Sequence, residues 1–136
     1  MKKLLILSLL ITTFFSCDKE LSNLKLSETI PGGCALEKGN AVNNSVSSEV
    51  DKVTYSLVNG NLEILFGFNA TCCGEYATKS EISGDLIVIQ VTTVQEGQCN
   101  CICYYTYNFI FTSSGTNYKY KVTLDDRLTF TGEIKH

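Results

Sequence analysis

The stretch that decides the fold is residues 53–68, which read VTYSLVNGNLEILFGF. Apolar and polar residues alternate on both sides of Asn59-Gly60, and such alternation is typical of a β-strand with one buried face. A two-residue Asn-Gly connection favours a type I′ turn, because both residues tolerate a positive φ. The stretch therefore predicts an antiparallel hairpin.

The same two-residue period recurs toward the C-terminus. Strand-like segments cover residues 85–94, 104–111, 118–124 and 128–134, with turn residues at Ser83-Gly84, Ser113-Ser114-Gly115 and Asp125-Asp126. The side chains expected to face the core are Leu62, Ile64, Phe66, Tyr107, Phe109, Phe111, Tyr120, Val122 and Phe130. About six or seven strands with short turns, and no sustained helical period after residue 34, predict an all-β domain. An antiparallel β-sandwich and a small β-barrel, stapled by disulfides, both fit this pattern.

The N-terminus has the pattern of an export signal. Lys2 and Lys3 precede an apolar run over residues 4–15, which is too short to cross a hydrocarbon core of roughly 30 Å as a helix. Cys17 follows the small Ser16, and this junction resembles the lipobox of bacterial lipoproteins. The resemblance implies cleavage before Cys17, acyl chains on that cysteine and attachment to a membrane.

These features divide the chain into three parts. We expect residues 1–16 to be the lipoprotein signal peptide, residues 17–33 to be the lipidated cysteine with a flexible tether, and residues 34–136 to be a single all-β domain. The tether prediction rests on a polar, aperiodic composition that ends in Pro31-Gly32-Gly33.

Charge and residue content argue against several classes of function. The whole chain has a formal charge of −3, and loss of Lys2 and Lys3 with the signal makes the remainder −5. Nucleic-acid binding is not expected, because it needs clustered cations. The only histidine is the C-terminal His136, so a Ser-His-Asp or Cys-His catalytic arrangement is not expected either. We interpret Asp125-Asp126 as solvated turn residues and predict neither enzymatic activity nor a cofactor.

Six cysteines follow Cys17, namely Cys34, Cys72, Cys73, Cys99, Cys101 and Cys103. An even number in an exported chain indicates disulfides, because the compartments outside the cytoplasm are oxidising. In an extended segment, residues two positions apart are about 6–7 Å from each other, which is near the limit for a bridge. Each cysteine of the 99–103 triplet is therefore expected to pair with one of the other three, in an order that the sequence leaves open.

Two other uses of these cysteines are open alternatives. Thiolate clusters bind soft ions such as Zn²⁺ or Cu⁺, so a cysteine-cluster metal-binding protein is the alternative function. Cys-x-Cys motifs also take part in thiol–disulfide exchange. Against both, an oxidising compartment removes free thiols, and no Cys-x-x-Cys stands at the start of a helix to lower a thiol pKa. We therefore predict no bound metal.

Cys72-Cys73 and the later Cys99-Asn100-Cys101-Ile102-Cys103 lead into an aromatic strand. Over residues 68–111 this arrangement resembles a group of uncharacterised secreted lipoproteins of the Bacteroidetes type. The resemblance implies location and fold rather than activity. It places the protein in the bacterial cell envelope, anchored by lipid to the outer membrane on its periplasmic or surface side.

One face of the predicted strand at 104–111 is a candidate contact surface. Ile102, Tyr104 and Ile110 share the face opposite Tyr107, where a solvated strand would carry polar residues. Either another layer covers these side chains or they contact a partner, which we expect to be an envelope protein or a glycan. In the second case Tyr104 and the cysteine loop at 95–103 form the contact region, with the disulfides keeping the loop rigid.

Overall fold

The computed structural model describes residues 24–35, 50–112, 115 and 117–135. This part of the chain contains eight strands: β1 (Lys25–Ala35), β2 (Lys52–Val58), β3 (Asn61–Thr71), β4 (Glu75–Ser83), β5 (Leu86–Gln95), β6 (Ile102–Thr112), β7 (Asn117–Leu124) and β8 (Leu128–Lys135). Among the same residues, no helix is long and apolar enough to cross a membrane.

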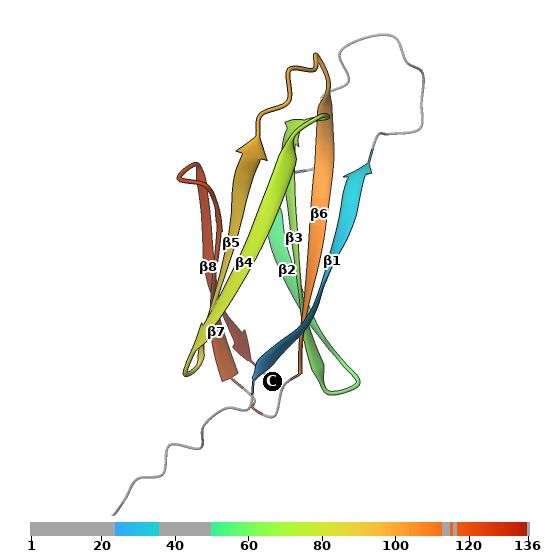
Figure 1. Cartoon of the computed structure of the whole chain (residues 1–136). Coiled ribbons are helices and arrows are strands. Elements are labelled where there is room, and N and C mark those ends of the chain that lie inside the picture. The colour runs from blue at the N-terminus through green and yellow to red at the C-terminus, as the bar shows by residue number, and fades with distance from the viewer. Residues whose placement is uncertain (1–23, 36–49, 113–114, 116, 136) are drawn as a thin grey trace, which may run out of the picture.

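The strands form two four-stranded sheets that face each other (Figure 1). Sheet A has the order β1-β6-β3-β2, and sheet B has the order β4-β5-β7-β8. The fold is therefore a β-sandwich, which decides between the two predicted architectures. One strand pair departs from the antiparallel pattern, because β5 and β7 pair in parallel. These strands run the same way because β6, which lies between them in the sequence, returns through sheet A.

The core lies between the two sheets and is built from the inward side chains of both. The largest fully buried ones are Phe66, Phe68, Phe109, Phe111, Leu62, Ile64, Ile87, Ile89, Leu124, Ile134, Val91 and Val122. The predicted inward set is confirmed: Tyr107, Tyr120 and Phe130 are half-buried against this core, and its other members are fully buried. Each large apolar side chain that leaves water stabilises the fold by about 1.5–3 kcal/mol.

The hairpin predicted at residues 53–68 is present. β2 and β3 pair in an unbroken antiparallel register, from Lys52 opposite Gly67 to Val58 opposite Asn61. Asn59 and Gly60 have φ values of 52° and 79°, as a type I′ turn requires. The predicted turn at Ser83-Gly84 joins β4 to β5, and Gly84 has a φ of 61°.

The β7–β8 turn contains Asp125-Asp126, which were predicted to be solvated, but Asp125 is hydrogen-bonded to β5. The Asp125 carboxylate accepts hydrogen bonds from the backbone N–H and the hydroxyl of Thr93, both at 2.8 Å. Burial pushes the pKa of Asp125 upward, but the bonds from Thr93 and from Arg127 outweigh it and lower this pKa from 3.8. Asp125 therefore ties the end of β5 to the turn, while Asp126 is exposed.

Two segments differ from the prediction. Residues 25–33, which were assigned to the flexible tether, belong to β1, an edge strand of sheet A that pairs with β6. Their alternation is obscured by register shifts between Leu26 and Glu28 and between Pro31 and Gly33, and Pro31 is tolerated because β1 is an edge strand. β4 was not predicted, because its inward positions include the polar Thr78 and Ser80.

Candidate functional site

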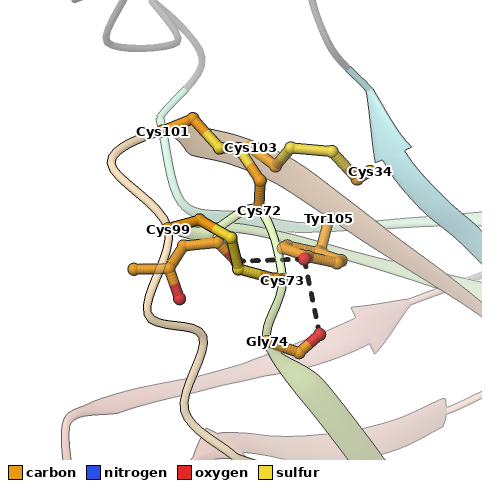
Figure 2. The surroundings of a disulfide bond; sticks show 9 residues. Cys34, Cys72, Cys73, Gly74, Cys99, Cys101, Cys103 and Tyr105 are labelled. Atoms are coloured by element: carbon orange, nitrogen blue, oxygen red, sulfur yellow. Dashed lines mark hydrogen bonds between the residues drawn. A yellow bond between two sulfur atoms is a disulfide. The ribbon is translucent and has the colours of Figure 1, made fainter.

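Three disulfides gather at one end of the sandwich, where β6 begins and β3 ends (Figure 2). Cys34 pairs with Cys103, Cys72 with Cys101 and Cys73 with Cys99, across Cα–Cα distances of 5.3, 5.6 and 6.1 Å. These distances lie in the ordinary range for a disulfide. Each member of the triplet bridges to one of the other three cysteines, which confirms the predicted cross-pairing.

The backbone around the bridges holds the cysteine loop close to the β3–β4 turn. The N–H of Cys72 donates to the carbonyl of Cys101 at 3.1 Å, which extends the β3–β6 pairing past the strand ends. Gly97 lies so close to the backbone of Cys73 and Gly74 that a Cβ there would collide with it. The loop at 95–101 is therefore pinned by backbone contact as well as by two disulfides.

An aromatic cluster supports the bridges from inside. The Tyr105 hydroxyl donates to the carbonyls of Thr71 and Gly74 at 3.0 and 3.4 Å, as Figure 2 shows. Its ring stacks on Phe68 and meets Tyr76 edge-on at 5.0 Å between centroids. Burial, followed by the neighbouring tyrosines, raises the pKa of both Tyr76 and Tyr107, so these phenols are neutral hydrogen-bonding groups.

The sulfur atoms of Cys34, Cys72 and Cys103 lie within 4.8 Å of one another. They come from two different bridges, so the first two disulfides are packed against each other. Three thiolates at this spacing would suit a soft metal ion, but all three sulfurs are bonded in disulfides. As long as both bridges are oxidised, these sulfurs have no charge with which to bind a cation.

The outer face of sheet A carries a strip of apolar side chains. Ile30, Leu65 and Ile102 are 42%, 38% and 37% exposed, and Ile110 is half-buried. Ile30 and Leu65 flank Asn108 on the two neighbouring strands, so they form one row across β1, β6 and β3. We call Ile30, Leu65, Ile102 and Ile110 the sheet A strip. Both sheets together contain every strand of the described residues, and none of them lies over this strip.

Tyr104 lies on the same face but is not an exposed contact residue. Its side chain is 7% exposed, its ring covers Gly67 of β3, and its hydroxyl donates to the carbonyl of Val50 at 3.4 Å. Within the described residues, Tyr104 is covered by its contacts with Gly67 and with the backbone of Val50, and no strand of either sheet lies over it. The expectation that Tyr104 presents its ring to a partner is therefore wrong, whereas Ile102 and Ile110 are placed as predicted.

A shallow hollow beside the strip is lined by polar side chains of β2, β3 and β6, with Leu65 as one wall. Asn108 donates from Nδ2 to the carboxylate of Glu63 at 3.2 Å. Its Oδ1 is buried and accepts no hydrogen bond from the described residues. Thr54 and Ser56 add hydroxyl groups to the same hollow.

No protein-family model matches the chain, and no curated protein or solved structure shows significant similarity to it. The predicted lipidation site, Cys17, lies outside the described residues. Sequence reasoning missed Ile30 and Leu65: Ile30 was assigned to the tether, and Leu65 stands at an outward position between the buried Ile64 and Phe66.

Proposed function

We propose that the protein is a non-catalytic binding module, anchored by lipid on Cys17 outside the cytoplasm, whose sheet A strip docks on a protein of the cell envelope. The observation that carries the binding role is the exposure of Ile30, Leu65 and Ile102 on the outer face of sheet A. Exposed aliphatic side chains gain most free energy when another apolar protein surface removes them from water.

Two further features support this role and location. Three disulfides in so small a domain are typical of proteins that fold in oxidising compartments. The bridges also hold the cysteine loop next to Ile102, so a partner that contacts both would immobilise little additional chain. A rigid surface of this kind suits binding better than it suits a reaction that needs moving parts.

Anchoring is tested by phase partitioning of the full-length protein with Triton X-114. The wild type is expected in the detergent phase, and Cys17→Ala is expected in the aqueous phase because it lacks the acyl chains. Wild-type protein in the aqueous phase would contradict the anchor while leaving the binding role to be tested separately.

Binding is tested by site-specific photo-crosslinking in intact cells. A benzophenone amino acid at position 65 is expected to give one discrete protein adduct, and Ile102→Lys in the same chain should abolish it. The matched control carries the benzophenone at position 131, where the exposed Thr131 lies on the outer face of sheet B. Adducts of equal yield from both positions would refute the docking surface, and an adduct that carries sugar rather than protein would assign the face to a glycan.

The alternative is a metal-binding role, favoured by the three sulfurs of Cys34, Cys72 and Cys103 within 4.8 Å. It requires that both bridges open before an ion can bind. Intact mass of the native and reduced protein, measured together with elemental analysis, separates the two functions. Three oxidised bridges without stoichiometric metal support the binding module, and free thiols with bound Zn or Cu support the alternative.

A further inference from the structure

The contact between two disulfides has a chemical consequence that does not depend on the proposed binding role. Cys72 is bonded to Cys101, yet its sulfur lies within 4.8 Å of both sulfurs of the Cys34–Cys103 bridge. Thiol–disulfide exchange needs a thiolate that reaches a disulfide sulfur, and its rate depends on access. Cys72 therefore lies beside both sulfurs of a bridge to which it does not belong.

Exposure to solvent decreases from Cys101 through Cys72 to Cys103. Cys101 is exposed, Cys72 is half-buried, and Cys103 is fully buried. A dithiol in solution therefore reaches the Cys72–Cys101 bridge through Cys101. It can approach the Cys34–Cys103 bridge only from the side of the half-buried Cys34, because Cys103 is fully buried. Cys73 and Cys99, whose bridge is exposed, lie outside the group of three close sulfurs.

We propose that Cys72 is a relay that passes reduction from the exposed Cys101 to the Cys34–Cys103 bridge, which it attacks at the buried Cys103. A dithiol attacks the Cys101 sulfur, the Cys72–Cys101 bond breaks, and Cys72 leaves as a thiolate. The second thiol of the reductant then displaces Cys101, so the dithiol is oxidised to its disulfide and the protein gains two electrons. The Cys72 thiolate next attacks Cys103, forms a Cys72–Cys103 bond and expels Cys34 as a thiolate, which takes up a proton.

The direction of the last step follows from the solvation of the two possible leaving groups. A thiol of lower pKa leaves faster, and burial in apolar surroundings raises the pKa of a thiol. Cys103 is fully buried, whereas Cys34 is half-buried on an edge strand, so Cys34 is the better leaving group. The expected product therefore has free thiols at Cys101 and Cys34.

The relay would act on the attachment of β1. This strand pairs with β6 alone within the described residues, and Cys34–Cys103 is the covalent bond that joins the two. After exchange, β1 is held in sheet A without a covalent bond, by backbone hydrogen bonds that two register shifts interrupt and by the packing of Leu24 and Leu26 on the core. Reduction at the surface is thus converted into release of the covalent tie on an edge strand.

The test removes Cys101, which frees Cys72 without any reductant. In Cys101→Ser, alkylation of the folded protein with iodoacetamide followed by peptide mapping is expected to label Cys34 as well as Cys72. The label on Cys34 should reach at least about a tenth of the label on Cys72. That ratio corresponds to a free-energy difference of about 1.4 kcal/mol between the two disulfide pairings. The matched control is Cys99→Ser, in which the freed Cys73 should carry all of the label.

Labelling of Cys72 alone in Cys101→Ser would overturn the relay, and so would equal scrambling of the bridges in Cys99→Ser. A second measurement on the wild type keeps the proposal falsifiable if Cys101→Ser fails to fold. Limiting dithiothreitol followed by rapid alkylation should label Cys101 together with Cys34. The pair Cys101 and Cys72, without Cys34, would show that the Cys34–Cys103 bridge does not take part.

Discussion

The outer faces of the two sheets differ although both sheets contribute to the same core. Sheet B carries ion pairs on its exposed face, including Lys79 with Glu81 at 2.6 Å and Lys135 with Glu133 at 3.0 Å. Sheet A carries the strip of Ile30, Leu65, Ile102 and Ile110 on its outer face. A strand with one solvated face normally alternates apolar and polar residues, as β4 and β8 of sheet B do.

The two outer faces therefore differ in how they meet water. Surface ion pairs add little stability, so the charges of sheet B serve mainly to keep that face in water. The apolar residues of the sheet A strip add nothing to solubility, and their side chains point away from the core. We make four predictions that test this comparison, beginning with a core side chain of sheet A and ending with an ion pair on the outer face of sheet B.

The largest effect is expected where sheet A faces the core. Phe109→Ala should lower the free energy of unfolding by about 3–5 kcal/mol, because Phe109 is 1% exposed and packs within the aromatic core. Its neighbour Ile110 points outward and is half-buried, so Ile110→Ala should cost only about 1 kcal/mol. Equal losses in urea unfolding would mean that the two faces of β6 are equally buried and that the comparison fails.

The second-largest effect is expected at Gly67, which the ring of Tyr104 covers on the outer face of sheet A. Gly67→Ala should cost about 1–3 kcal/mol, because the new Cβ collides with the ring and hydroxyl of Tyr104. The cost should largely disappear in a Tyr104→Ala background, which a double-mutant cycle measures. Ala77→Val on the exposed face of sheet B is the control, and a comparable loss there would show that steric crowding is not specific to sheet A.

A smaller, pH-dependent effect is expected at the end of sheet B. Asp125→Asn should cost about 1 kcal/mol near neutral pH, because it weakens the bonds from Thr93 to a partly exposed carboxylate. The pKa of Asp125 is lowered in the folded protein, so its contribution is present above the ordinary value of 3.8 and is lost as pH falls through the folded pKa. Urea unfolding from about pH 6 to about pH 2 should therefore show the two proteins converging at the acid end. A difference that is independent of pH would show that the carboxylate charge is not involved.

The smallest effect is expected on the exposed face of sheet B. The bond from Lys79 lowers the pKa of Glu81, yet both side chains are more than half exposed. Glu81→Gln should leave thermal unfolding unchanged, because water and salt screen an exposed ion pair. A clear loss of stability would mean that the face of sheet B is structural rather than merely solvated.

Local patterns were enough for much of the fold. The Asn59-Gly60 turn, the strands from β5 to β8 and the inward positions of β3 and β6 were all predicted, because a two-residue period needs no distant partner. Cross-pairing of the cysteines was also predicted, since neighbours two apart on a strand are poorly placed to bridge. β1 and β4 escaped the prediction, because a broken register and inward polar residues hide their alternation.

The sequence by itself determined which residues form most of the strands and which side of each strand is apolar, since both depend on neighbours in the chain. Only the tertiary structure decided that β5 and β7 run parallel, that Cys34 joins Cys103 and that Tyr104 is buried over Gly67 while Ile30 and Leu65 are exposed. These features depend on which strands become neighbours. Such pairings join residues far apart in the sequence, and they leave no periodic pattern within any one strand.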